Sequence, residues 1–251
     1  MHHIFIKENE NIYENLSFII PKNSENYIHL VKSLRVKINE IVLVSIQKYD
    51  YKTKIIKIDD NELVLKIIER SEKNELPIYI TLIQGLAKKD KLDIITDNTT
   101  ELGVSQIIPC EMKNSIVKYE EKKKKNVVER LQKISTQAAM QSRRGFIPIV
   151  SDIMNFREAL DTVKDYDYKF LFYEEKIGVD ETIYFLNKME NNKKCAIIIG
   201  PEGGFSNEEI EYAKEVGCSI FSLGKRILRT ELASTCILSY IMMMFENKNV
   251  Y

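Results

Sequence analysis

The chain has 251 residues, of which 44% are hydrophobic, 29% are charged and 9% are aromatic. This length and composition suit one large folded domain or two small ones, and they exclude bulk disorder and a fibrous protein. Lysine plus arginine (37) equals aspartate plus glutamate (37), so the formal net charge is zero. A neutral chain has no overall attraction to nucleic acid, so any such binding must depend on local basic patches.

The cysteines, the histidines and the N-terminal residues indicate whether the chain has a metal site and in which compartment it is expected. The N-terminal residues MHHIFIKENE show no secretory signal, and no apolar run reaches the roughly 18 residues that a membrane span needs. The four cysteines are far apart, and the three histidines all lie near the start of the chain. We therefore expect a cytoplasmic protein with no membrane segment, no metal site and no disulfide framework.

The first part of the chain contains short runs rich in β-forming residues, separated by polar turns. A small antiparallel barrel or sheet is predicted there, with one amphipathic helix over residues 26–35. The polar stretch 71–75 ends at Pro77 and is typical of a linker. We therefore predict two domains, residues 1–72 and residues 75–251. The strands expected in the first domain are residues 3–6, 41–46, 52–58 and 63–68.

From residue 78 onward, strand-like runs alternate with helical ones, which predicts parallel βαβ units and an α/β fold. The run 195–200 is apolar on both faces and therefore suits a central strand. The other expected strands are residues 78–84, 106–110, 168–173 and 219–223. The expected helices are residues 89–102, 123–141, 155–163, 181–189, 207–216 and 231–246.

Glycines are concentrated directly after the most apolar strand, in residues 200–204 with the sequence GPEGG, which we call the glycine bend. Ser206 and Glu209 follow with the spacing of a capping box, so a helix should begin there. Ligands of α/β sheets bind outside the carboxyl ends of the strands, and glycine lets the backbone approach them closely. The bend is either such a ligand loop or a plain strand-to-helix turn. It matches neither a dinucleotide fingerprint nor a P-loop.

Arginines are concentrated in residues 223–231 with the sequence LGKRILRTE, which we call the arginine bend. Only eight of the 37 basic residues are arginine, and four of them form the pairs Arg143/Arg144 and Arg226/Arg229. A chain that otherwise uses lysine favours arginine where a planar fork must hold phosphate or carboxylate. The alternative is a structural arginine–glutamate pair.

The two bends together resemble the paired motifs of the RsmE family, SPOUT-class methyltransferases that form N3-methyluridine in bacterial 16S ribosomal RNA. Similar segments are KKDKLD at residues 88–93, ELGV at residues 101–104, and Gln141, Arg144 and Pro148. In the N-terminal part, His29 and Leu34-Arg35 are weaker matches. The chain departs from the family at Lys225, where proline is usual, and at Leu232, where threonine is common.

The resemblance implies a C-terminal SPOUT α/β domain with a trefoil knot, preceded by a small PUA-like β-barrel domain that binds RNA. It also implies S-adenosyl-L-methionine as cofactor, a homodimer, and 16S rRNA or the small ribosomal subunit as partner. In the last predicted helix, Leu238, Ile241, Met242 and Phe245 suit either a dimer seam or ordinary core.

The implied reaction moves a methyl group to uridine N3, which must first lose its proton. Arg229 and Arg226 are predicted either to stabilise the uridine anion or to hold a phosphate, and Glu231 either accepts the proton or orients Arg229. The predicted cofactor-binding residues are Ile199, Gly200, Glu202, Gly203, Leu223, Gly224, Ile227 and Leu228. The predicted RNA-binding residues are Arg35, Lys88, Lys89, Lys91 and Arg144.

Two other functions remain open from the sequence. One is a SPOUT methyltransferase with a different target nucleotide or a ribose target. The other is a non-catalytic RNA-binding protein that assists assembly. A nicotinamide oxidoreductase is disfavoured because the dinucleotide fingerprint is missing.

Overall fold

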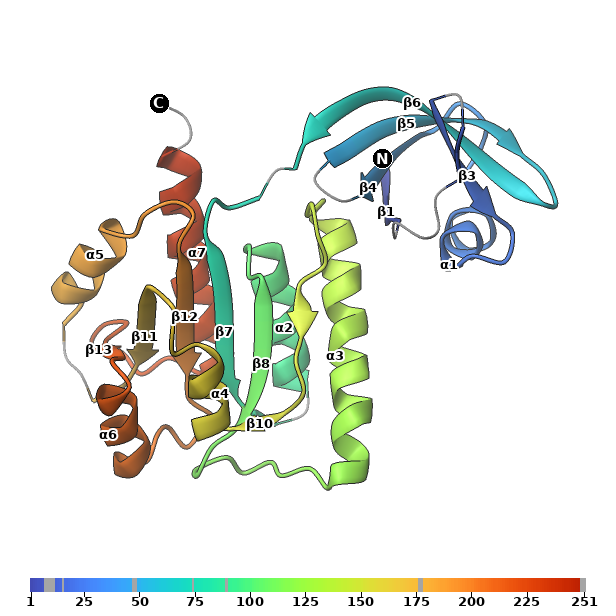
Figure 1. Cartoon of the computed structure of the whole chain (residues 1–251). Coiled ribbons are helices and arrows are strands. Elements are labelled where there is room, and N and C mark those ends of the chain that lie inside the picture. The colour runs from blue at the N-terminus through green and yellow to red at the C-terminus, as the bar shows by residue number, and fades with distance from the viewer. Residues whose placement is uncertain are drawn as a thin grey trace. The chain divides into compact units, whose positions relative to one another are not determined.

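Figure 1 shows the computed structural model of the chain. It divides into two units, each described below by itself. The first unit comprises Met1–Glu75 and Ala139–Phe146, and the second comprises Leu76–Ala138 and Ile147–Tyr251. The structure describes residues 1–6, 12–14, 16–46, 49–73, 75–88, 90–175 and 178–248.

The first unit is built on a six-stranded sheet with the order β1-β4-β5-β6-β3-β2. Neighbouring strands are antiparallel except β1 and β4, which pair in parallel, so the prediction of a small antiparallel barrel or sheet was wrong at β1 alone among the described pairs. The hairpin of β2 and β3 was not predicted. The strands are β1 (His2–Phe5), β2 (Ile12–Glu14), β3 (Ser17–Pro21), β4 (Ile41–Ile46), β5 (Tyr49–Ile58) and β6 (Glu62–Glu72).

The predicted helix of the first unit is present but irregular. It consists of α1 (Glu25–Tyr27), which Ser24 caps, followed by a π-helical segment η2 (Ile28–Ser33). Its buried face packs on a core formed by alternate residues of the sheet, because side chains at every second position of a strand point to the same face. The fully buried residues of this core include Ile4, Leu30, Val42, Val44, Ile55, Leu63 and Leu65.

A chain of buried polar groups crosses the first unit beside this core. The His3 Nε2 lies 2.7 Å from Ser45 Oγ, and the Ser45 hydroxyl lies 2.5 Å from Asp50 Oδ1. The His3 Nδ1 lies 3.3 Å from the carbonyl oxygen of Met140. Burial lowers the pKa of His3 to about 4, because an imidazolium is costly to remove from water. Burial raises the pKa of Asp50 for the same reason.

The second unit has a parallel sheet with the order β10-β8-β7-β12-β11-β13, to which β9 adds beside β8. The apolar strand β12 lies inside the sheet, which confirms its predicted central position. The strands are β7 (Tyr79–Gly85), β8 (Gln106–Glu111), β9 (Ile149–Val150), β10 (Met154–Asn155), β11 (Tyr168–Phe172), β12 (Lys194–Ile199) and β13 (Ser219–Phe221).

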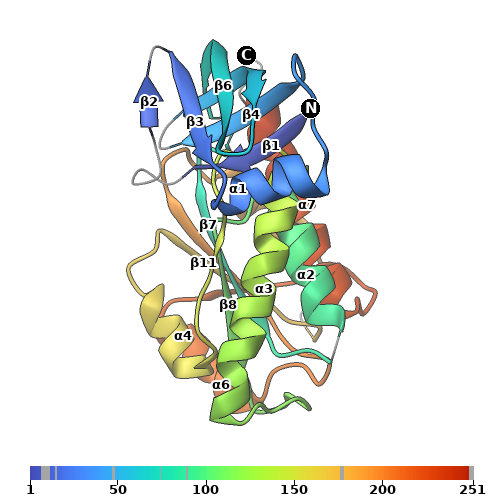
Figure 2. The same ribbon diagram turned by 90° about the vertical axis from the view of Figure 1, so that its right-hand side faces the viewer.

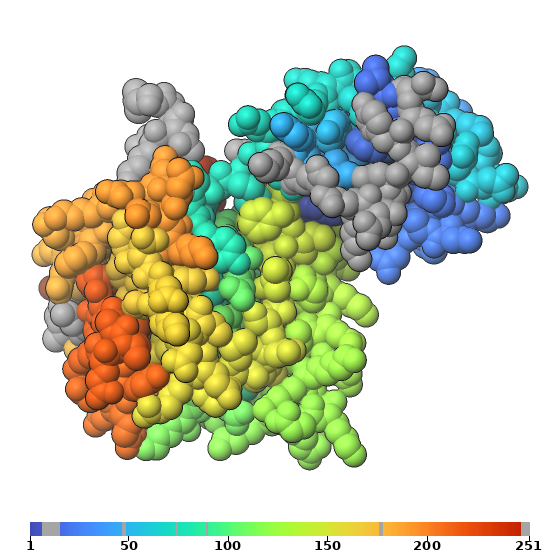
Figure 3. Space-filling model, viewed as in Figure 1, coloured from blue at the N-terminus to red at the C-terminus, as the bar shows by residue number. Residues whose placement is uncertain are grey.

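Helices cover both faces of this sheet, as Figure 2 shows in a view along its edge. Residues of α2, α3, α5 and α7 share one buried cluster, and residues of α4 and α6 share the other. Figure 3 shows the outer sides of α4 (yellow) and α6 (orange-red) on one face of the second unit. The helices are α2 (Asp90–Glu101), α3 (Glu121–Gln141), α4 (Phe156–Thr162), α5 (Asp180–Asn187), α6 (Asn207–Glu215) and α7 (Thr230–Lys248).

Most of the α7 residues that the sequence assigned to either the core or a dimer seam belong to the core. Leu238, Ile241 and Phe245 are fully buried in the core of the second unit, and Met242 is half-buried. The opposite side of α7 is apolar and exposed at Leu232, Tyr240 and Met243, the last with 66% of its surface exposed.

Within the described ranges, none of the helices combines the length and apolar character that crossing a membrane requires. The same ranges contain no group of three or more histidine, cysteine or acidic residues arranged to hold a metal ion.

Candidate functional site

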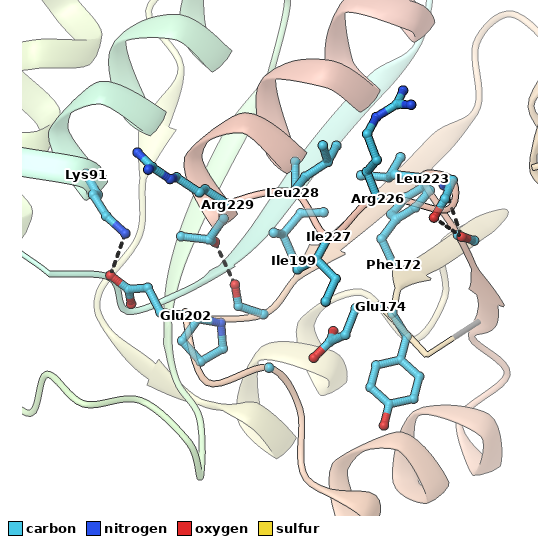
Figure 4. A pocket seen from close by; sticks show the side chains of 18 residues that line it. Lys91, Phe172, Glu174, Ile199, Glu202, Leu223, Arg226, Ile227, Leu228 and Arg229 are labelled. Atoms are coloured by element: carbon cyan, nitrogen blue, oxygen red, sulfur yellow. Dashed lines mark hydrogen bonds and ion pairs between the residues drawn. The ribbon is translucent and has the colours of Figure 1, made fainter. Parts of the chain in front are cut away.

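The glycine bend and the arginine bend meet at the carboxyl edge of the parallel sheet, where they line one cavity of about 270 Å³ (Figure 4). This volume is close to the lower end, roughly 300 Å³, of the range for small-molecule sites. The bends follow β12 and β13, and β11 lies between these two strands in the sheet. The predicted catalytic and cofactor-binding residues that line the cavity are Ile199, Gly200, Glu202, Leu223, Gly224, Arg226, Ile227, Leu228 and Arg229. Lys91, which was predicted to bind RNA, also lines it.

A short chain of hydrogen bonds joins the two bends. The Thr230 hydroxyl donates to the carbonyl oxygen of Gly200 at 2.6 Å and accepts from the Gln84 side-chain amide at 2.8 Å. Gln84 and Thr230 are buried, so these bonds are shielded from water. A side chain on Gly85 would lie 2.6 Å from Pro201 Cδ, so glycine is required where β7 passes the glycine bend. The hydrogen bonds of Thr230 thus hold the start of α7, directly after Arg229, against Gly200.

The glycine bend keeps the helix start that the sequence predicts. The Ser206 side chain accepts from the backbone of Glu209, and the Glu209 carboxylate accepts from the backbone of Ser206, forming the capping box that begins α6. Gly204 has a φ of +66°, a conformation that favours glycine. A side chain at Gly204 would also collide with the carboxylate of Glu174.

An ion-pair network lies at one side of the cavity. The Glu202 Oε1 accepts from the backbone N–H of Lys88 at 3.1 Å and lies 3.1 Å from Lys91 Nζ. The same Nζ lies 3.5 Å from Glu231 Oε2. Figure 4 shows the Lys91 side chain pointing at Glu202. Lys91 therefore joins the first turn of α2 to the glycine bend and to the first turn of α7.

Two of the predicted catalytic and cofactor-binding residues, Gly203 and Glu231, do not line the cavity. A side chain on Gly203 would lie 2.7 Å from the carbonyl oxygen of Asn114, and Asn114 donates to the Gly203 carbonyl at 3.1 Å. Gly203 therefore serves the close packing of two loops. Glu231 contacts Lys91 and is not among the residues around the cavity, so its predicted catalytic role remains a prediction.

Of the predicted RNA-binding residues, Arg35 and Lys88 are exposed, whereas Lys91 belongs to the ion-pair network above. Lys89 lies outside the described residues.

Arg144 is buried, so the predicted phosphate contact does not fit its geometry. Its Nε lies 2.9 Å from both carboxylate oxygens of Glu75, and its Nη2 lies 2.8 Å from Glu75 Oε2. This is the structural arginine–glutamate pair that the sequence left open.

Several residues that line the cavity were not predicted from the sequence. Thr230 lies between the predicted residues Arg229 and Glu231 and was passed over. The segment after β11 was not considered, although the rule that ligands bind at the carboxyl ends of parallel strands points to it. The cavity residues missed are Phe172, Tyr173, Glu174, Pro201, Gly204, Ser222, Thr230 and Ala233.

Comparisons with known proteins identify the family of this chain. A family model described as "RNA methyltransferase domain" matches residues 74–242. The chain is 34% identical to ribosomal RNA small subunit methyltransferase E of Bacillus subtilis over 222 residues, which covers 86% of this chain and 87% of the relative. It is 29% identical to the enzyme of the same name from Mesomycoplasma hyopneumoniae, over 95% of this chain and 98% of the relative.

Among solved structures, the chain resembles ribosomal RNA small subunit methyltransferase E from Neisseria gonorrhoeae bound to S-adenosyl methionine. The TM-score is 0.81, the identity is 26%, and 98% of each chain is covered. The fold and the cavity thus define an α/β protein with a small-molecule site at the carboxyl edge of its parallel sheet. The chain belongs to the RsmE family of RNA methyltransferases.

Proposed function

We propose that this chain is an S-adenosyl-L-methionine-dependent methyltransferase that forms N3-methyluridine in the 16S ribosomal RNA of the small subunit. The main observation is that the glycine bend and the arginine bend line one cavity. Relatives that span most of the chain are named for methylation of small-subunit rRNA, and one similar structure holds S-adenosyl methionine.

The cavity fits that cofactor chemically. Ile199, Leu223 and Leu228 supply apolar walls, as a site for a nucleoside and a thioether-like chain requires. The Glu202 Oε2 is buried and has no hydrogen-bond partner among the described residues, so it can accept from an N–H of a ligand. The carboxylate of Glu202 also gives this wall a negative charge that suits a cationic sulfonium. The bound cofactor would supply the electrophilic methyl group.

The remaining chemistry belongs to the chain itself. Uridine N3 becomes nucleophilic only when its proton leaves, and the resulting charge spreads onto the carbonyl oxygens O2 and O4 of the base. Arg229 and Arg226 are exposed at the cavity and can stabilise that charge as it develops. Glu231 can accept the proton or hold a neighbouring cation in place. Electrostatic help from Arg229, with in-line positioning, is the mechanism we favour.

The two parts of the chain have separate roles in this proposal. Residues 1–72 form a PUA-like RNA-binding barrel, and residues 75–251 form a SPOUT domain with a trefoil knot. The mostly antiparallel sheet of the first unit and the parallel sheet of the second support this division. Arg35 and Lys88 are the exposed cations proposed to contact RNA phosphates.

The active form is proposed to be a homodimer in the cytoplasm. Leu232, Tyr240 and Met243 form an exposed apolar stripe on α7, which supports pairing with a second copy.

The test is incubation of the protein with labelled cofactor and small subunits that lack the modification, followed by nucleoside analysis. Labelled N3-methyluridine is the expected product. A label in another nucleoside would assign a different target to the same chemistry. RNA binding without cofactor binding or label would instead favour a non-catalytic assembly protein.

A further inference from the structure

We propose that Lys91 is a positioning residue of the cofactor pocket, which holds Glu202 and Glu231 in place as fixed negative charges, and that it does not contact RNA phosphate. This inference rests on the proposed function, since it concerns the same cavity. It changes the role that the sequence suggests for Lys91 and gives Glu202 a defined charge.

The geometry places the Lys91 ammonium between two carboxylates. Its Nζ is 3.1 Å from Glu202 Oε1 and 3.5 Å from Glu231 Oε2. The Lys91 side chain is 32% exposed, while those of both acids are 19% exposed. An ammonium held in this way is directed into the protein. A phosphate would have to compete with two carboxylates for it.

Each of the two glutamates has one carboxylate oxygen whose hydrogen bonding is incomplete. The Oε2 atoms of Glu202 and Glu231 are both buried without a hydrogen-bond partner among the described residues. Lys91 is the cation near both, although its distance to Glu231 Oε2 is that of an ion pair. Without it, neither carboxylate would keep an ion pair among the residues that the structure describes. A buried carboxylate that loses its partner is destabilised far more than an exposed one.

Glu202 and Lys91 also stabilise each other's charged forms. Burial works to raise the pKa of Glu202, but the backbone N–H groups of Lys88 and of Glu202 itself, together with the Lys91 ammonium, outweigh it, and the pKa is lowered overall. The pKa of Lys91 is raised, chiefly by its hydrogen bond to Glu202. Both groups therefore stay charged near neutral pH. The other charged groups around the cavity are Arg226, Arg229 and Glu174.

This network also joins three segments that are distant in sequence. Lys91 lies in the first turn of α2, Glu202 in the glycine bend, and Glu231 in the first turn of α7. The Lys88 N–H adds a second bond from the turn before α2 to Glu202. Loss of the ammonium should therefore loosen one wall of the cavity without removing any residue that touches the methyl donor's apolar parts.

The test compares Lys91→Met with Lys124→Met. Lys124 is a matched control because it also lies between two carboxylates, Glu121 and Glu111, with a side chain that is 24% exposed, but it is not among the cavity residues. Titration calorimetry with S-adenosyl-L-methionine and no RNA should show about tenfold weaker binding for Lys91→Met. Lys124→Met should bind as wild type does, and Lys91→Arg should restore most of the affinity.

The pH dependence of cofactor binding separates a positioning role from a general loss of structure. Wild-type affinity should stay level from pH 8 to pH 5, because Glu202 remains ionised. In Lys91→Met the pKa of Glu202 rises, so affinity should fall further as the pH is lowered. The double variant Lys91→Met, Glu202→Gln should bind no more weakly than Glu202→Gln alone, because both changes act through one carboxylate.

The outcomes distinguish this inference from the proposed function. If wild-type protein does not bind the cofactor, the proposed function fails. If wild type binds and Lys91→Met binds equally well, with a level pH profile, the positioning role is wrong. A reduced salt dependence of RNA binding in Lys91→Met, of the kind expected for Lys88→Met, would assign Lys91 to phosphate contact instead.

Discussion

In the first unit the guanidinium of Arg144 is buried against the carboxylate of Glu75, whereas in the second unit Arg226 and Arg229 are exposed beside a cavity. Both clusters look alike in the sequence, because each concentrates arginine in a chain that prefers lysine. A guanidinium buried against a carboxylate is committed to that partner, and removal of either group is costly, while an exposed guanidinium remains available to a ligand. Burial and partner, and not residue type, separate the two roles.

The largest expected effect is on the stability of the first unit. Arg144→Met leaves the Glu75 carboxylate without its cation and should cost about 3–5 kcal/mol. Arg229→Met should leave unfolding almost unchanged, because its guanidinium is exposed. Chemical denaturation of the two variants, followed by amide hydrogen exchange in β1 and β4, measures the difference. Equal stabilities would remove the distinction between the two clusters.

The next effect concerns catalysis at the arginine bend. Arg229→Ala should lower kcat by about 100-fold or more, because a preorganised positive charge beside the developing anion is lost. Cofactor affinity should remain near the wild-type value. Single-turnover methylation and calorimetry measure the two quantities separately. Near-normal turnover would contradict the role assigned to Arg229.

A smaller effect is expected where the two bends are joined. Thr230→Val keeps the shape of the side chain but removes the hydroxyl that donates to the Gly200 carbonyl and accepts from the Gln84 amide. The loss should be roughly 2–3 kcal/mol, seen as a lower melting temperature and weaker cofactor binding. Thr230→Ser, which keeps the hydroxyl, should have a melting temperature and a cofactor affinity close to those of the wild type. If Thr230→Ser behaves like Thr230→Val, the hydroxyl is not what joins the bends.

The smallest effect is a pH dependence in the first unit. Burial lowers the pKa of His3 from 6.5 to about 4, so the unfolded chain binds a proton more readily than the folded chain between these values. Stability should therefore fall as the pH drops through this window, by roughly 1–2 kcal/mol between pH 7 and pH 5. The raised pKa of Asp50 acts in the opposite direction nearer its own titration.

Denaturation of wild type and of His3→Gln across this pH range provides the measurement. The variant should show a flatter profile. A wild-type protein whose stability does not change, or rises, toward pH 5 would contradict the assignment of a neutral, buried His3.

The sequence was most informative where local pattern determines structure. The strand β12 was predictable because it is apolar on both faces, and α6 because Ser206 and Glu209 have capping-box spacing. The two bends at strand ends, the glycine bend and the arginine bend, together supplied the predicted cofactor-binding residues, and both line the cavity. Short or long-range features were not accessible in this way. The strand β2 has only three residues, and Glu75 is 69 residues away from Arg144 in sequence.

For two of the predicted site residues, the structure shows close partners that the sequence did not indicate. Gly203 was singled out for the ligand, yet the close approach it permits is to Asn114. Lys91 was singled out as an RNA contact, yet its nearest charged groups are two acids. In both cases the partner comes from a distant part of the chain, so no local pattern could identify it.

The first unit takes its residues from two stretches, Met1–Glu75 and Ala139–Phe146, separated by more than sixty residues of the second unit. During translation, a nascent chain that has emerged only as far as Glu75 lacks the Met140 carbonyl beside His3 and the Arg144 partner of Glu75. Amino-terminal domains commonly fold before later ones are synthesised. Here, completion of the earlier unit has to wait until more than half of the polypeptide has been made.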